Sequence, residues 1–145
     1  MPVVTFHLID NETNNAKAEE LLQGACALYA EVLEAPIERI RAFITMHRAD
    51  QFLVNGQLCS RNGVNSPFFD FIIMNGRPIE LHNRLMKGFT DLLVEVLGVD
   101  RDHVRGICRR VEPEDWCISG VPASEARKAE VEARKAAAAA VAAKA

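Results

Sequence analysis

The sequence contains an internal duplication, in which position n matches position n + 64 along most of its 145 residues. Conservative pairs such as Phe52/Trp116 lie between identical ones. One supersecondary unit therefore occurs twice, and the fold has to place two copies of it together. The identical pairs share this single offset without gaps: Ile9/Ile73, Asn11/Asn75, Leu21/Leu85, Gly24/Gly88, Leu28/Leu92, Glu31/Glu95, Val32/Val96, Leu33/Leu97, Arg41/Arg105 and Gly56/Gly120.

The first copy predicts a strand, a helix and a second strand. Residues 3–9 alternate apolar and polar side chains, which is typical of a strand with one buried face. Residues 11–15 supply a turn and a helix N-cap, and the apolar residues of 16–33 recur at helical spacing. Pro36 ends the helical region, and residues 40–46 alternate again as a strand.

The second copy predicts the same order. Residues 68–74 form a strand, which is followed by a helix that starts near Pro78 and ends at Gly98. Residues 104–111 form the last long strand.

Two short segments predict hairpins. Residues 52–56 and 116–120 are short apolar pieces that end in glycine, as small hairpins do. Residues 57–66 are expected to form a polar linker between the two halves.

Two βαβ units with right-handed crossovers predict an α+β fold, a four-stranded sheet with both helices on one face. The other face then has no cover, so we expect the chain to assemble through it. We assign residues 1–122 to this domain, with pseudo-repeats 2–60 and 66–120. Residues 123–145 are an Ala-rich C-terminal helix or tail, which either packs on a neighbouring subunit or frays in solution.

The charge balance argues against a nucleic-acid partner. Lys and Arg number 17 against 20 Asp and Glu, and the formal net charge is -3. Neutralising a phosphate backbone requires clustered positive charge. No apolar stretch is long enough to span a bilayer, and the N-terminus lacks the pattern of a signal peptide, so we expect no membrane partner and a cytoplasmic protein.

The cysteines and histidines predict neither a metal site nor a disulfide framework. No C-x-x-C pair is present, so we expect reduced and mostly buried cysteines at Cys26, Cys59, Cys108 and Cys117. The histidines, His7, His47, His82 and His103, have no spacing that forms a metal site.

The second residue, Pro2, is the unusual chemical feature. We expect removal of Met1, because it precedes a small residue, and this exposes a secondary amine at the start of a strand. Free α-amino groups titrate close to neutrality, and adjacent cations lower the pKa further. A group with such a pKa suits a general base.

The sequence resembles the tautomerase superfamily, whose members use an amino-terminal proline as base. LEAPIERIRAFIT followed by QFLVNGQL is similar to the pattern of 4-oxalocrotonate tautomerase. MNGRPIELHNRLMKGFTDLLVEVL resembles the second half of longer members, in particular 5-carboxymethyl-2-hydroxymuconate isomerase. The resemblance covers residues 2 to 120.

The resemblance implies roles for four residues. Pro2 takes the position of the catalytic base. Arg41 matches the strand arginine of the family, and Arg77 matches the arginine that follows a glycine after the first strand. Phe52 matches the aromatic residue that lines the pocket. Guanidinium groups bind carboxylates through paired N–H donors and stabilise a developing enolate, so Arg41 and Arg77 are expected to hold the substrate.

Arg105 and Trp116 are the second-half equivalents of Arg41 and Phe52, and both are candidates for substrate binding. The alternative for Arg41 and Arg105 is a solvated strand face or a subunit-interface ion pair, and for the aromatic residues a core or interface position. The loop of residues 10–13 has no cation, and Ser66, which matches Pro2, is internal. We therefore expect one site per chain, and three in a homotrimer.

The resemblance implies a cofactor-independent isomerase acting on a hydroxymuconate-like unsaturated dicarboxylate. Pro2 would take a proton from the dienol and return it to the far carbon. One alternative is a relative of malonate semialdehyde decarboxylase or of the haloacrylate dehalogenases and hydratases, which need a protonated proline and a residue that activates water. Another is a non-catalytic trimeric binding module.

Overall fold

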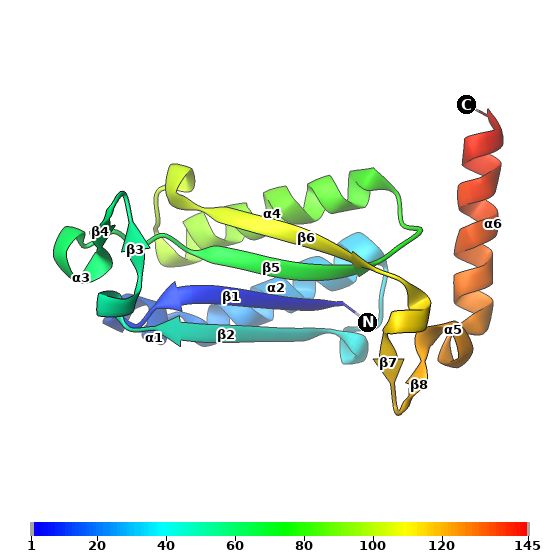
Figure 1. Ribbon diagram of the computed structural model, residues 1–145, viewed down its shortest axis with the longest axis horizontal. Coiled ribbons are helices and arrows are strands. Elements are labelled where there is room, and N and C mark those ends of the chain that lie inside the picture. Colours follow the sequence, from blue (N-terminus) through cyan, green and yellow to red (C-terminus); the bar gives the residue numbers. More distant parts are fainter. Residues whose placement is uncertain (1, 145) are drawn as a thin grey trace.

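The computed structural model describes residues 2–144 of the chain, so the expected removal of Met1 lies outside the described residues. The strands β1 (Val3–Ile9), β2 (Arg41–His47), β5 (Phe68–Met74) and β6 (Arg105–Val111) form one sheet in the order β2-β1-β5-β6. The helices α2 (Ala18–Leu33) and α4 (Ile79–Leu97) cover one face of it (Figure 1). The predicted α+β fold of two fused βαβ units is confirmed.

The strand directions decide which segments meet. β1 runs parallel to β2, and β5 runs parallel to β6, as expected for two βαβ units. The two units join where β1 pairs with β5, and this pairing is antiparallel, with Val3 opposite Ile72. The beginning of β1 therefore lies at the same end of the sheet as the ends of β5 and β6 (Figure 1).

Two glycines set the distance between the helices. A Cβ at Gly24 of α2 would lie 2.7 Å from the Leu92 side chain of α4, and one at Gly88 of α4 would lie 2.6 Å from Leu28 of α2. These are two of the duplicated pairs, Gly24/Gly88 and Leu28/Leu92. The pseudo-twofold arrangement places each glycine against the leucine of the other copy, which explains why both identities occur together.

The first strands of the copies align with an offset of 65 instead of 64 (2 to 67, 3 to 68). β1 and β5 have the same length and burial pattern, and the Pro2 and Pro67 carbonyls accept from the Arg41 and Arg105 amides. The predicted matches of Ile9 with Ile73 and of Asn11 with Asn75 are therefore wrong, because these residues do not occupy equivalent positions in the two strands. The structural equivalent of Pro2 is Pro67, not Ser66. The helices keep the offset of 64, so the second copy has one residue fewer between its first strand and α4 than the first copy has between β1 and α2.

The helical region of the first copy begins earlier than predicted. Asn11 accepts a hydrogen bond from the Asn14 amide at 2.7 Å and caps α1 (Glu12–Ala16). A break at Lys17 separates α1 from α2. The asparagines that predicted a turn therefore cap and form a first helical segment.

Both predicted hairpins are present. β3 (Leu53–Val54) and β4 (Gln57–Leu58) form one, and β7 (Cys117–Ile118) and β8 (Val121–Pro122) form the other. Their turns place Asn55 and Gly56 at φ of 57° and 75°, and Ser119 and Gly120 at 53° and 87°. Two consecutive residues with positive φ are typical of the type I′ turn. The expected polar linker of residues 57–66 is wrong, because it contains β4 and the helix α3 (Cys59–Asn62).

Four single turns of 3-10 helix connect the larger elements. They are η1 (Ile37–Arg39), η2 (Ala49–Gln51), η3 (Arg101–His103) and η4 (Pro113–Asp115). η1 leads into β2 and η3 into β6, so the same kind of turn precedes the last long strand of each copy.

The face of the sheet opposite the helices is uncovered and of mixed character. Phe43 is 52% exposed and Ile107 is 40% exposed on it. Asp70 accepts from Arg109 at 2.9 Å, and Nδ1 of His7 lies 2.9 Å from Nε2 of His47. The uncovered face agrees with the prediction, but it combines apolar side chains with charged and polar pairs.

The Ala-rich segment forms the helices α5 (Ala123–Ala126) and α6 (Lys128–Lys144). Val131 of α6 is buried on the chain's own sheet end, whereas Val141 is 70% exposed. The first turns of α6 therefore pack within the chain, an outcome that the two expected alternatives did not include, and its remainder projects from the body (Figure 1). Among residues 2–144 there is no helix of the length and apolar character needed to cross a membrane.

Candidate active site

Pro2 lies at the floor of a small cavity at the end of the sheet that α5 and α6 cover. Its side chain is buried, and its carbonyl accepts the Arg41 amide at 3.0 Å, which fixes it at the start of the β1–β2 ladder. The cavity has a volume of about 40 Å³, enough for water molecules only. Its other apolar walls come from the ends of α2 and β5 and from the C-terminal segment: Leu33, Ala35, Ile72, Ile73, Met74, Ile118 and Val131.

Four guanidinium groups line the same cavity. Arg39 comes from η1, Arg77 from the loop after β5, Arg127 from the junction of α5 and α6, and Arg134 from α6. They bring an excess of positive charge to the cavity that Pro2 lines. Positive neighbours disfavour a protonated amine, so this environment favours an uncharged nitrogen at Pro2 once it is an amine.

One carboxylate, Glu130, partly balances this charge. Arg39 donates to its two oxygens at 3.2 and 3.0 Å, and Arg134 lies 3.8 Å from it. The hydrogen bond from Arg39, followed by the charges of Arg39, Arg134 and Arg127, lowers the pKa of Glu130 despite its desolvation. Glu130 is therefore ionised at neutral pH and holds α6 against the cavity.

Arg77 reaches the Pro2 cavity because β5 is antiparallel to β1. It follows the turn Asn75-Gly76, where Gly76 has φ of 101°, and it donates to the Leu33 carbonyl at 3.2 Å. Burial lowers the pKa of Arg77 to about 10, and the charge of Arg134 adds to this effect. Arg77 still carries its charge at neutral pH, and no carboxylate among the described residues pairs with it.

Arg41 and Trp116 lie in a groove that adjoins the Pro2 cavity. The groove has a volume of about 610 Å³ and shares Arg39, Arg127 and Ile118 with the cavity. Arg41 donates to the backbone carbonyls of Glu38 and Ile40, at 3.0 and 3.3 Å. The structure thus places these two predicted residues next to the Pro2 cavity but not inside it.

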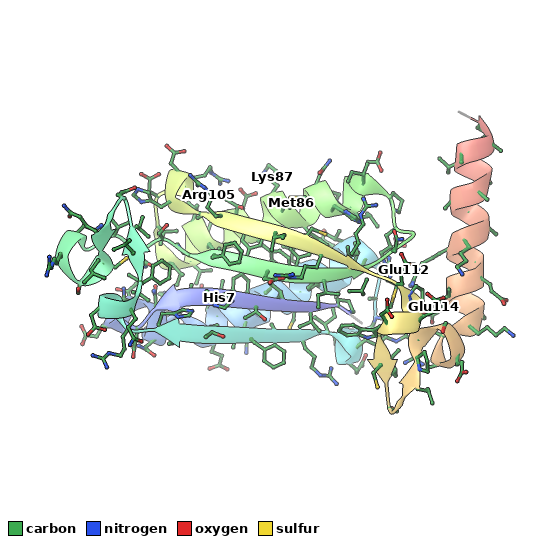
Figure 2. The ribbon with its side chains drawn as sticks, viewed as in Figure 1. His7, Met86, Lys87, Arg105, Glu112 and Glu114 are labelled. Carbon is green, nitrogen blue, oxygen red and sulfur yellow. The ribbon has the colours of Figure 1, made fainter. Side chains whose placement is uncertain are left out.

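Phe52 and Arg105 lie at the other end of the sheet in the same chain. Figure 2 shows Arg105 at the end remote from Glu112 and Glu114, which lead toward the hairpin β7–β8. The Arg105 amide donates to Pro67 at 3.2 Å, and the Phe52 ring lies 5.8 Å from the His47 ring. A single chain therefore does not bring Phe52 or Arg105 to Pro2.

The second copy has no equivalent base. Pro67 is fully buried inside the chain, and its nitrogen is a tertiary amide. With the offset of 65, Glu12 takes the position of Arg77, so that position has no cation in the first copy (12 to 77). The expectation of one site per chain rests on this pair of differences.

Sequence reasoning did not single out Arg39, Arg127, Arg134 or Glu130. Three of these residues belong to the C-terminal segment, which has no counterpart in the first copy. The spacing of Glu130 and Arg134 indicated only a helix with an i,i+4 pair. Nothing in the sequence indicated that this helix folds back over the first residue of β1.

Tyr29 of α2 supports the site from below. It is fully buried, and its hydroxyl lies 2.8 Å from the Ile72 carbonyl and 3.1 Å from the Val3 carbonyl. Val3 and Ile72 are opposite each other where β1 meets β5. Burial raises the pKa of Tyr29, so the hydroxyl stays protonated and donates to these two strands next to the Pro2 cavity, which Ile72 lines.

Other titratable side chains do not extend the site. Within residues 2–144 no three His, Cys, Asp or Glu side chains lie close enough together to hold a metal ion. Burial lowers the pKa of His7, and the charge of His47 adds to this effect. Burial also lowers the pKa of His82, and the charge of Arg110 adds to it. All four cysteines are free, but only Cys59 is buried, so the expectation of mostly buried cysteines is wrong.

The sequence is similar to short tautomerases, although no family model matches it. Over 62 aligned residues it is 32% identical to "Probable tautomerase RSp0893" of Ralstonia nicotianae. The aligned region spans 43% of this chain and 89% of that protein. Over 61 aligned residues it is 31% identical to the 2-hydroxymuconate tautomerase of Pseudomonas fluorescens. This aligned region spans 42% of this chain and 95% of that protein. Each relative therefore corresponds in length to about one of the two copies.

Solved structures of longer proteins share the fold. Pt0534 inactivated by 2-oxo-3-pentynoate has a TM-score of 0.78 and 18% identity, covering 86% of this chain and 98% of its own. Native fused 4-OT has a TM-score of 0.77 and 21% identity, and the match covers 85% of this chain and 97% of that one. A chain of a fused 4-OT symmetric trimer has a TM-score of 0.76 and 22% identity, and the match covers 86% of this chain and 98% of that one. With its sequence similarity to RSp0893 across 89% of that protein, this chain belongs to the tautomerase superfamily of enzymes.

Proposed function

We propose that this tautomerase shifts a proton within a hydroxymuconate-like unsaturated dicarboxylate, and that Pro2 is its base after removal of Met1. The observation that carries the proposal is the position of Pro2, buried at the floor of a cavity lined by four arginines. An amine there has the charge environment of a neutral base. The name of the Pseudomonas fluorescens relative, a 2-hydroxymuconate tautomerase, supports the substrate class.

The proton transfer balances within the substrate. The nitrogen lone pair of Pro2 takes the hydroxyl proton of the dienol, and the electron pair left on oxygen forms a conjugated dienolate. The protonated Pro2 then returns this proton to the far carbon, so no atom is gained or lost. Neighbouring guanidinium groups stabilise the negative charge of the dienolate, which is usually the larger contribution to the rate.

Arg77 is the proposed partner of the first carboxylate. Its guanidinium lines the Pro2 cavity, remains charged, and makes only one hydrogen bond, to a backbone carbonyl. Paired N–H donors of this kind orient a carboxylate and hold it in place. Arg41 lies in the adjoining groove, where its charge is proposed to attract the remainder of the dicarboxylate.

A six-carbon dicarboxylate needs more room than about 40 Å³, so we expect it to extend from the Pro2 cavity into the groove of about 610 Å³. This path passes between Arg39 and Arg127, which line both spaces. The substrate then lies along a row of cations. That arrangement suits a molecule with a carboxylate at each end.

A homotrimer is the proposed assembly, and the fused 4-OT trimer supports it. The uncovered sheet face offers the contact surface, with Phe43 and Ile107 exposed on it. In a trimer, Phe52 and Arg105 of one subunit would approach the Pro2 cavity of the next. This is the form in which both remain candidates for substrate binding.

The comparisons do not favour the decarboxylase or hydratase alternatives or a non-catalytic module, because the named relatives are tautomerases. The test is ultraviolet spectroscopy of 2-hydroxymuconate with the wild-type enzyme, with Pro2→Ala and with Pro67→Ala. Pro67→Ala is a matched control, because it changes the equivalent strand start in the other copy. We expect loss of activity for Pro2→Ala only, and equal rates for wild type and Pro2→Ala would overturn the proposal.

A further inference from the structure

Two side chains that line the groove next to Pro2 carry buried N–H donors that lack an acceptor. Nε of Arg127 and Nε1 of Trp116 have no hydrogen-bond partner among residues 2–144. Both residues line the groove. An unsatisfied buried donor destabilises the fold, so a pair of them on side chains that line one groove points to an acceptor that binds there.

The other guanidinium groups of the groove are already engaged. Arg39 is bound to Glu130 through both carboxylate oxygens. Arg41 is turned toward the backbone carbonyls of Glu38 and Ile40. Arg127 makes one hydrogen bond, to the adjacent Ala126 carbonyl at 3.2 Å, and has no carboxylate partner within the described part of the chain.

The backbone holds Arg127 rigidly at this place. Its amide donates to the Ala123 carbonyl at 2.8 Å, and its carbonyl accepts from the Val131 amide at 2.9 Å. Ala123 is fully buried and its own amide donates to the Trp116 carbonyl at 2.8 Å. Arg127 and Trp116 are thus fixed to each other through the turn of α5, as two parts of a binding site should be.

We propose that Arg127, together with Trp116, binds the second carboxylate of the substrate and thereby selects dicarboxylates over monocarboxylates. This inference rests on the proposed function, because it assumes that the first carboxylate and the reacting carbons lie in the Pro2 cavity. It adds a specificity-determining residue from the C-terminal segment, outside the duplicated part of the chain. It also assigns a use to the donors that the folded chain leaves without acceptors.

The test uses Trp116 as the probe, because it is the only tryptophan of the chain. Its fluorescence is titrated with muconate, a six-carbon diene with two carboxylates, and with sorbate, the six-carbon diene with one. Neither compound needs to react, so the result does not depend on the proposed isomerisation. The variants are Arg127→Gln, Arg127→Lys and, as control on the exposed side of the same turn, Lys128→Gln.

We expect muconate to bind the wild type at least 10-fold more tightly than sorbate. Arg127→Gln should abolish this preference and leave sorbate binding unchanged, Arg127→Lys should restore part of it, and Lys128→Gln should keep it. Equal affinity of the wild type for both compounds would overturn the inference, as would an Arg127→Gln variant that loses both equally. Failure of the proposed function would give a different result. The wild-type enzyme would then bind muconate more tightly than sorbate but would not isomerise 2-hydroxymuconate.

Discussion

Arg39 and Glu130 join two segments that lie 91 positions apart in the sequence, through hydrogen bonds of 3.2 and 3.0 Å from one guanidinium nitrogen to both carboxylate oxygens. Arg39 belongs to the turn before β2 and Glu130 to the first turn of α6. The pair fixes the C-terminal helix over the Pro2 cavity. It therefore connects the stability of the Ala-rich helix with the shape of the site.

This ion pair predicts a stability contribution that depends on pH. The pKa of Glu130 is lowered in the folded chain, so its contribution is present above the pKa of an unfolded glutamate and is lost as the pH falls through the lower folded value. Glu130 is 42% exposed, so the contribution is below about 1 kcal/mol. Denaturant unfolding at pH 7 and pH 3 should show Glu130→Gln less stable than wild type at pH 7, with a smaller deficit at pH 3. Glu132→Gln, on the exposed side of α6, is the control, and an identical deficit at both pH values would contradict the account.

Arg77→Gln should lower kcat/KM for 2-hydroxymuconate by about 100-fold, because it removes a cation from the position where dienolate charge forms. Steady-state kinetics measures this effect. Arg84→Gln, an exposed arginine on α4, should leave kcat/KM unchanged. Wild-type kinetics for Arg77→Gln would remove Arg77 from the mechanism.

Gly24→Ala should destabilise the fold by about 1–3 kcal/mol, because the new Cβ would meet the Leu92 side chain. Helix propensity alone predicts the opposite sign, a gain of about 1 kcal/mol. Denaturant unfolding of Gly24→Ala, Leu92→Ala and the double variant tests the contact. The double variant should be more stable than the sum of the single effects predicts, and simple additivity would show that the two side chains do not interact.

Tyr29→Phe should cost about 1 kcal/mol of unfolding free energy, because the carbonyls of Val3 and Ile72 lose their shared donor. Since Val3 follows Pro2 and Ile72 lines the same cavity, kcat should fall while KM for 2-hydroxymuconate stays close to the wild-type value. Unfolding curves and steady-state kinetics on the same preparation measure both effects. A variant with wild-type stability and wild-type kcat would show that the hydroxyl does not support the site.

The sequence predicted the four long strands and the two long helices because their apolar periodicity is strong. Strand 3–9 matches the structure in both bounds, and the glycine turns predicted the two hairpins. The misplaced offset of the first strands has a simple cause. Identical residues at Ile9/Ile73 and Asn11/Asn75 suggested an ungapped alignment, but strand register is set by which side chains face the core, and a one-residue shift reverses that.

The site was only partly predictable for a different reason. The resemblance implied Pro2 and Arg77 as site residues, and the antiparallel pairing of β1 and β5 brings both to one cavity. Arg39, Arg127 and Glu130 meet through a C-terminal segment that folds back on the chain, and periodicity carries no information about such a contact. The segment has the composition of a weakly amphipathic helix, so its sequence predicted the helix but not the surface that it covers.

Pro2 can act as the base only if it is a free amine kept neutral by its guanidinium neighbours, and a nitrogen titration of the enzyme labelled with ¹⁵N-proline measures this state. The chain has six prolines, and once Met1 is removed only Pro2 carries an amine, so only its signal can titrate. The account predicts one titrating proline nitrogen, with a pKa below that of an ordinary α-amine and equal to the pKa on the ascending limb of the kcat/KM profile. A chain in which no proline nitrogen titrates, or in which the pKa is that of an ordinary α-amine and differs from the kinetic value, would contradict it.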